Sequence, residues 1–257
     1  MQMPVSISFS GDQSRAAFQI FHPTGNIITS EMLDALRAGM EGISQNPHLK
    51  LVTIEGAGAD FSFGASIQEH TSEEIGRVLP RMHAVVEDLL DLPAATAAVV
   101  KGRCLGGGFE LALACDFVFA ADDAVFGLPE SVLGVFPPAA STLLPARVGY
   151  ARATAAVLTG AHRQAGYWLD AGLITLIAPA SDLQARVDAW YDEHLAPKSA
   201  VAIRYASAAV RSGLRVQVRD TLPVLERLYL QDLMRTHDAQ EGVQAFLQKR
   251  APRWRDT

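Results

Sequence analysis

A single carboxylate, Glu110, lies in an otherwise apolar run from Cys104 to Ala114, CLGGGFELALA. The three glycines of this run let the backbone approach a ligand closely, and a helix beginning there presents free N–H groups and the positive end of its dipole. A buried carboxylate is unfavourable unless it has a partner or a chemical task. The run therefore indicates an anion or oxyanion site beside a functional acid. The alternatives are a strand-to-helix turn without a ligand and a structural glutamate paired with an arginine.

A second carboxylate and a second loop also have the composition of a ligand site. Glu130 ends the stretch GLPE, which follows an apolar strand at a turn where the side chain could project into a cleft. The loop from Phe61 to Ser66, FSFGAS, follows an expected strand, and loops in this position of layered α/β folds often hold ligands. Taken singly, Glu130 is typical of a surface turn and FSFGAS of a hydrophobic turn.

Other site chemistries find little support in the sequence. The stretch GAGADF has Phe61 where a dinucleotide-binding fingerprint would have its last glycine. The seven histidines show neither HExxH nor the His/Cys spacing of metal sites, and neither a GxSxG elbow nor a P-loop is present. We therefore expect no metal site.

Strands and helices alternate through the first part of the chain, which predicts an α/β layered core. Strands are expected at Val5–Phe9, Ala16–Phe21, Leu51–Ile54, Ala95–Val100 and from Phe117 onward. The glycine turn at residues 106–108 is expected to lead into a helix that continues through Ala114.

Two earlier helices are expected from apolar periodicity. The first has Ser30 as its N-cap and buries Met32, Leu33, Leu36, Met40 and Ile43. The second follows the capping-box pair Thr71 and Glu74 and is ended by Pro93. Its apolar stripe consists of Ile75, Val78, Leu79, Met82, Val85, Val86, Leu89 and Leu90.

After about Ala196 the sequence becomes rich in alanine and arginine with helical spacing, and Pro197 and Pro223 are expected to be breaks. We therefore predict an α/β core at residues 1–196 and a helical module at 197–257. Residues 1–197 have a net charge of −11 and residues 198–257 a net charge of +5. A basic segment of this kind can hold ligand phosphates, contact an acidic neighbouring subunit or bind nucleic acid.

The composition predicts a globular protein that acts in solution. The apolar fraction is 49%, and the apolar runs are broken well before the roughly 18 residues that span a bilayer. The first residues lack the basic and apolar regions of a secretory signal, and the two cysteines, Cys104 and Cys115, suggest a reducing compartment. We expect a cytoplasmic location and no membrane partner.

The three site elements, in this order, resemble those of the crotonase (enoyl-CoA hydratase/isomerase) superfamily. The resemblance extends from the strand before Pro23, through FSFGAS, CLGGGFELALACD and FGLPESVLGVFP, to the terminal FLQKR. It implies a ββα spiral core with a C-terminal α-helical oligomerisation module. It also implies a homotrimer, or a dimer of trimers.

The resemblance implies a role for each site residue. The backbone N–H groups of Ala65 and Gly107 would form an oxyanion hole for the thioester carbonyl, and Glu110 and Glu130 would hold a water molecule. In hydration, Glu110 would activate that water and Glu130 would protonate carbon. Further substrate-binding positions would be Phe63, Ile67, Gly106, Pro129, Pro137, Phe246 and Lys249, the lysine contacting a phosphate of the coenzyme. The partner is an acyl-CoA thioester, so coenzyme A belongs to the substrate and no separate cofactor is expected.

The sequence departs from many hydratases of the superfamily at two places. Ser66 replaces an aspartate of the oxyanion loop, and the stretch PPAAS at residues 137–141 replaces a glycine-rich run. These departures, with FSFGAS followed by EH, VLGVF and HLAPKSA, are similar to the cyclohexa-1,5-diene-1-carbonyl-CoA hydratases of aromatic degradation. That resemblance implies a cyclic dienoyl thioester as substrate.

Two alternatives remain at this stage. An enoyl-CoA isomerase or another enolate-forming relative would move protons with only one of the two glutamates. A non-catalytic or RNA-binding relative of the same fold is supported only by the basic C-terminal segment. That segment lacks regularly interleaved aromatic residues for base stacking, so we expect no nucleic-acid partner.

Overall fold

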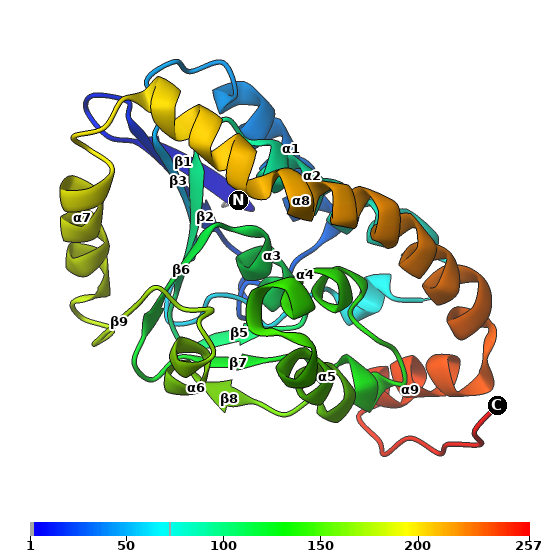
Figure 1. Cartoon of the computed structure of the whole chain (residues 1–257). Helices are drawn as coiled ribbons and strands as arrows, with labels where there is room; N and C mark the ends of the chain where they lie inside the picture. The colour runs from blue at the N-terminus through cyan, green and yellow to red at the C-terminus, as the bar shows by residue number, and fades with distance from the viewer. Residues whose placement is uncertain (1–2, 72) are drawn as a thin grey trace.

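A computed structural model describes residues 3–71 and 73–257 of the chain, and its centre is a pair of β-sheets (Figure 1). The larger sheet has the order β1-β2-β3-β4-β6-β9, in which β1 and β2 are antiparallel and the remaining neighbours are parallel. The smaller sheet has the order β5-β7-β8. The strands are β1 (Val5–Phe9), β2 (Arg15–Ile20), β3 (Leu51–Gly56), β4 (Ala95–Val100), β5 (Arg103–Leu105), β6 (Phe117–Ala121), β7 (Val125–Gly127), β8 (Arg163–Gln164) and β9 (Leu176–Ala178).

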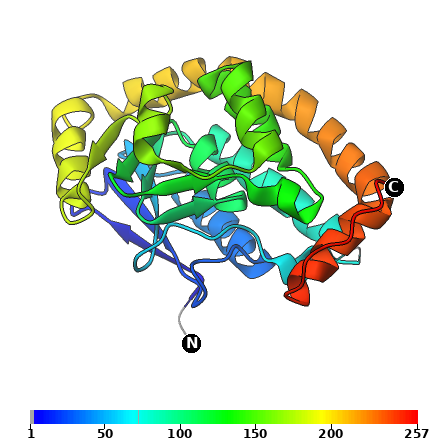
Figure 2. The ribbon, with the colours of Figure 1, turned by 90° about the horizontal axis from the view of Figure 1, so that it is seen from below.

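Helices surround the two sheets and form a continuous C-terminal layer (Figures 1 and 2). The α-helices are α1 (Ser30–Ile43), α2 (Ile75–Asp91), α3 (Gly107–Ala114), α4 (Pro138–Val148), α5 (Tyr150–Thr159), α6 (Ala165–Asp170), α7 (Leu183–His194), α8 (Ala200–Arg227) and α9 (His237–Leu247). Short helical turns are η1 (Ile67–Glu69), η2 (Pro129–Leu133), η3 (Leu228–Asp232) and η4 (Leu233–Arg235). The mixed α/β architecture and the helical C-terminal region agree with the expected fold class.

Helix α1 buries the apolar face that its periodicity predicts, but it begins with a different cap. Met32, Leu33, Leu36, Met40 and Ile43 are all buried. The prediction of Ser30 as N-cap is wrong, because Ser30 is already helical and Thr29 precedes it in an extended conformation. The Thr29 hydroxyl accepts a hydrogen bond from the Met32 N–H at 3.3 Å, which satisfies one N–H of the first turn.

Helix α2 lacks the predicted capping box. The backbone carbonyl of Thr71 accepts hydrogen bonds from the N–H groups of Glu74 and Ile75, at 3.1 and 2.9 Å. These bonds close a turn before the helix, so Glu74 becomes the N-cap without a side-chain cap bond. The predicted apolar stripe is buried, and the helix ends at Asp91, before Pro93.

Helix α3 is the most enclosed helix of the site, since all eight of its residues are buried. It leads from β5 toward β6, and its C-terminal end is held by Arg147 of α4. The Arg147 guanidinium donates to the carbonyls of Leu113, Cys115 and Asp116, which lack helical partners at this end. This arrangement fixes the helix that carries Glu110.

Helix α8 runs along one side of the molecule from the region of α7 to that of α9 (Figures 1 and 2). The prediction that Pro223 breaks a helix is wrong, because it lies inside this 28-residue helix. Proline removes one backbone donor, and its partner carbonyl would belong to Arg219. Both Pro223 and Arg219 are exposed, so water can satisfy that carbonyl.

Arg211 ties α8 to the core. Its side chain is 3% exposed and donates to both carboxylate oxygens of Asp116, at 2.8 Å for the Nε–Oδ1 contact. It also donates to the carbonyls of Leu92 and Ala94, each at 2.7 Å. Buried charge of this kind is tolerated because every part of it is paired. The division of the chain near Pro197 stays a prediction.

Replacement of Arg211 by leucine should strongly destabilise the protein, because it leaves the Asp116 carboxylate without its counter-ion, and Asp116 Oδ1 and two carbonyls without their donor. We expect the free energy of unfolding in urea to fall by about 3–5 kcal/mol.

Arg219→Leu is the matched control, since Arg219 forms an exposed ion pair with Asp91 at 2.9 Å and should cost less than about 1 kcal/mol. Equal losses in the two variants would contradict this account.

Candidate active site

A cavity of about 480 Å³ gathers the residues expected to act on a substrate. Of the eleven positions named from the sequence, it is lined by Phe63, Ala65, Ile67, Gly106, Gly107, Glu110, Pro129, Glu130, Pro137 and Phe246. Lys249 does not line it; this exposed residue lies three positions after Phe246. Its contact with a phosphate remains a prediction.

The loop after β3 is hydrogen-bonded alongside strand β5. The Ser62 N–H donates to the Arg103 carbonyl, and the Leu105 N–H donates to the Ser62 carbonyl, both at 2.9 Å. This pairing brings Ala65 close to the start of α3. A Cβ atom added at Gly107 would lie only 3.4 Å from the Ala65 nitrogen.

The N–H group of Ala65 stands out because both of its neighbours in the loop are paired. The Gly64 N–H donates to the Ser62 hydroxyl at 3.0 Å, and the Ser66 N–H donates to the Ile28 carbonyl at 2.9 Å. Within residues 3–71 and 73–257, the N–H groups of Ala65 and Gly107 form no hydrogen bond. Gly107 is the first residue of α3, where a helix leaves its N–H groups without internal partners. Two neighbouring donors are therefore available to one oxygen atom of a ligand.

Two glycines are required by this loop geometry. Gly64 and Gly106 have φ angles of 101° and 50°, in the region that other residues rarely adopt. A Cβ atom at Gly106 would also meet Glu130 Oε1 at 2.8 Å. The glycine-rich composition thus allows the loop to turn and a carboxylate to approach it.

Glu110 is buried on α3 and faces the start of α4. Its Oε1 accepts a hydrogen bond from the Ala140 N–H at 2.9 Å. Burial raises the pKa of Glu110 to about 7, and the N–H groups of Ala140 and Ala139 partly oppose that rise. The PPAAS stretch thus has a structural role, because Pro138 begins α4 and the next residues direct their N–H groups at the carboxylate.

Glu130 reaches the same cavity from η2. The residue is partly exposed, but its Oε2 atom is buried and has no hydrogen-bond partner in the described part of the chain. Burial, followed by the negative charge of Glu110, raises the pKa of Glu130 to about 8. Two carboxyl groups whose pKa values lie near neutrality can hold and exchange one proton, as acid–base catalysis requires.

The cavity also contains a wall that the sequence did not indicate as part of the site. Helix α2 contributes Ile75, Val78, Leu79 and Met82, and the segment before α4 contributes Phe136. The apolar stripe of α2 predicts burial but does not distinguish a cavity wall from core. Helix α2 becomes a cavity wall because Ile75 and Leu79 pack with Tyr229 and Met234 of the C-terminal segment.

Five polar side chains of the cavity were also missed: Thr24, Gln68, His70, His162 and Tyr229. His70 Nδ1 lies 2.7 Å from the Ser66 carbonyl, and burial lowers the pKa of this histidine. The EH that follows FSFGAS was a sequence signal for His70, whereas the sequence carried no comparable signal for Tyr229.

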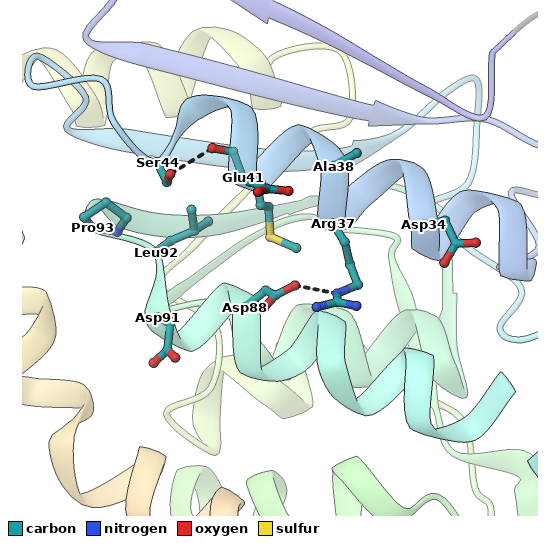
Figure 3. A pocket seen from close by; sticks show the side chains of 10 residues that line it. Asp34, Arg37, Ala38, Glu41, Ser44, Asp88, Asp91, Leu92 and Pro93 are labelled. Carbon is teal, nitrogen blue, oxygen red and sulfur yellow. Dashed lines mark hydrogen bonds and ion pairs between the residues drawn. The ribbon is translucent and has the colours of Figure 1, made fainter. Parts of the chain in front are cut away.

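A larger hollow, of about 580 Å³, lies elsewhere, between α1 and α2 (Figure 3). Its lining includes Asp34, Glu41 and Asp91, and an ion pair joins Arg37 to Asp88 at 2.7 Å. Among the residues that the structure describes, no group of three or more His, Cys, Asp or Glu could hold a metal ion. We assign the chemistry to the smaller cavity, because it combines unpaired amides with two carboxyl groups of raised pKa.

The described residues contain no helix that is both long enough and apolar enough to span a membrane. The two cysteines are unpaired and buried.

The sequence and the fold of this chain are similar to those of known proteins. The Enoyl-CoA hydratase/isomerase family model matches residues 12–257. A cyclohexa-1,5-dienecarbonyl-CoA hydratase of Thauera aromatica is 39% identical over 98% of this chain and 96% of its own length. A probable enoyl-CoA hydratase of Bacillus subtilis is 32% identical over 97% of this chain and 98% of its own. The crystal structure of an enoyl-CoA hydratase from Mycobacterium avium subsp. paratuberculosis has a TM-score of 0.86 and 30% identity, covering 98% of each chain.

Replacement of Glu130 by glutamine should make the protein more stable at alkaline pH. A carboxyl whose pKa is raised on folding is more protonated in the folded state, so wild-type stability falls as pH rises from about 4.5 to about 8. The variant lacks this contribution. Urea unfolding should show its advantage over wild type growing by roughly 2–4 kcal/mol between pH 5 and pH 9.

Glu31→Gln is the matched control, because Glu31 is exposed on α1 and forms no ion pair with the described residues. Its stability relative to wild type should not change over the same pH range. An advantage of the Glu130 variant that is independent of pH would contradict the assignment of a raised pKa to this carboxyl.

Proposed function

Because the chain belongs to the enoyl-CoA hydratase/isomerase family, we propose that it adds water to the double bond of an α,β-unsaturated acyl-CoA thioester. The observation that carries this proposal is the presence of both Glu110 and Glu130 in the cavity that contains the unpaired N–H groups of Ala65 and Gly107. Such an enzyme is a carbon–oxygen lyase, which catalyses the reaction in both directions.

The N–H groups of Ala65 and Gly107 bind the thioester oxygen. When water adds to the β-carbon, electrons of the double bond move toward the thioester and its oxygen becomes negative. Two backbone donors stabilise this enolate most strongly when its charge has developed, which lowers the barrier. The beginning of α3 contributes a favourable dipole at the same place.

The glutamates move the protons. Glu110 accepts a proton from the water while the water oxygen forms a bond to the β-carbon. Glu130 donates a proton to the α-carbon. The two carboxyls exchange roles in the reverse reaction. Burial raises the pKa of both carboxyls, so the pair can hold a proton near neutral pH and supply it during the reaction.

We further propose that the acyl group is a cyclic dienoyl thioester. The similarity to the Thauera aromatica hydratase supports this assignment. So does the apolar and aromatic character of the cavity, where Phe136, Pro137 and Pro138 lie opposite α2. Rigid, flat side chains of this kind suit a ring better than they suit a flexible chain. The reaction would belong to acyl-CoA metabolism, in the degradation of aromatic compounds.

Isomerisation without hydration is less well supported, because it needs only one of the two carboxyls. The remaining expectations stay proposals: an oligomerisation role for the C-terminal module, a homotrimer or a dimer of trimers, and a cytoplasmic location.

Glutamine substitutions test the two carboxyls separately. We expect Glu110→Gln and Glu130→Gln each to lower kcat for hydration by about 100-fold or more, since each removes one proton-transfer step. Hydration can be followed by the loss of enoyl thioester absorbance, with Glu31→Gln as the control of unchanged activity. Full activity in either variant would overturn the two-glutamate mechanism.

A substrate panel tests the acyl group. Wild-type protein should add water, detected as a gain of one water mass, to cyclohexa-1,5-diene-1-carbonyl-CoA with a kcat/KM at least about tenfold above that for crotonyl-CoA. A preference for crotonyl-CoA would reject the cyclic substrate and leave hydratase activity in place. Absence of hydration with every enoyl and dienoyl thioester would reject the function itself.

A further inference from the structure

Tyr229 occupies an unusual position between the long helix and the C-terminal turn. It lies in η3, a π-helical turn that follows α8. Such turns are rare and occur frequently at functional sites. Only 2% of the Tyr229 surface is exposed, yet the residue lines the cavity that contains the two glutamates. The π-helical turn thus directs a large polar side chain inward.

Apolar packing fixes the direction of the Tyr229 ring. Its edge-to-face contact with Phe136 has a centroid distance of 5.4 Å and an interplanar angle of 63°. It also belongs to a buried cluster with Ile75 and Leu79 of α2 and Met234 of η4. A ring held on several sides has little freedom to rotate its hydroxyl into solvent.

The Tyr229 hydroxyl has no protein partner in the described part of the chain. Burial raises the pKa of Tyr229, and the charges of Glu130 and Glu110 raise it further. Tyr229 lines the same cavity as both carboxyls and is hydrogen-bonded to neither. A buried tyrosine hydroxyl normally has a hydrogen-bond partner. The buried Glu130 Oε2 atom also lacks a partner among the described residues, and both Glu130 of η2 and Tyr229 of η3 line the cavity.

We propose that Tyr229 is a further catalytic residue whose phenol O–H donates a hydrogen bond to the oxygen that water adds to the acyl group. This inference rests on the proposed hydratase function. The thioester oxygen belongs to the amides of Ala65 and Gly107, whereas the added oxygen lies beside the glutamates. The added oxygen is therefore the acceptor that this proposal assigns to the phenol. A donor in this position orients the water before attack and holds the product hydroxyl afterwards.

Tyr229→Phe tests this role, because it removes the hydroxyl and retains the ring that packs on Phe136. The probes are cyclohexane-1-carbonyl-CoA, which lacks the added oxygen, and 2-hydroxycyclohexane-1-carbonyl-CoA, which carries it next to the thioester-bearing carbon. Calorimetric Kd values should show that the variant binds the hydroxylated probe about fivefold more weakly than wild type does, the effect of one net hydrogen bond. Binding of the probe without the hydroxyl should change less than twofold.

Tyr191→Phe is the matched control. Tyr191 is a buried tyrosine of α7 whose hydroxyl lies 2.6 Å from the Ser14 Oγ, and it does not line the cavity. Its substitution should leave the ratio of the two Kd values unchanged. The Tyr229→Phe variant should also show a lower kcat for hydration than the Tyr191→Phe variant.

An equal loss of affinity for both probes, or no loss for either, would overturn the role of the hydroxyl and reduce Tyr229 to a packing residue. These outcomes differ from failure of the proposed function. In that case wild-type protein would hydrate no enoyl or dienoyl thioester, whatever residue occupies position 229.

Discussion

The burial of two carboxyl groups in one apolar cavity is the constraint on which this site depends. Glu110 lies on a helix with no exposed residue, and Glu130 has an oxygen that no described residue satisfies. Removal from water makes their charged forms unfavourable, so their pKa values rise to about 7 and 8. The same desolvation that lowers the stability of the fold makes both groups able to hold or release a proton near neutral pH. Stability and reactivity are therefore opposed at this place.

The pair of unpaired amides at Ala65 and Gly107 arises from a different constraint, the close approach of the loop after β3 to the start of α3. Backbone pairing between Ser62 and β5 brings the segment around Ala65 against the start of α3. Glycine is needed at positions 64 and 106 because the chain adopts positive φ there. The amide pair is thus a consequence of main-chain hydrogen bonding, while the acids depend on side-chain burial. Chemistry on a thioester needs both, because charge develops on one oxygen while protons move at two neighbouring atoms.

The C-terminal helices complete the site as well as covering the core. Arg211 fixes α8 by satisfying Asp116 and two carbonyls in the interior. At the far end of the same helix, η3 and η4 form a small apolar cluster with α2. That cluster is the wall facing the carboxyls, and it contains Tyr229. The attachment of α8 at Arg211 therefore helps to position Tyr229, which lines the cavity that contains the two glutamates.

Local patterns predicted much of this fold: the strand bounds Val5–Phe9 and Ala95–Val100 were predicted without error, and the helix through Ala114 was predicted with its start placed after Gly108 instead of at Gly107. The loops around Glu110, Glu130 and Ala65 were indicated by their residues, whereas the selection of Ala65 and Gly107 as donors came from the family resemblance; the cavity contains all four residues. The cap at Thr71 and the break at Pro223 failed because backbone pairing and solvent exposure outweigh such local signals. Tyr229 could not be found at all. Its importance depends on a π-helical turn and on neighbours distant in sequence, and only the packing of the folded chain brings these together.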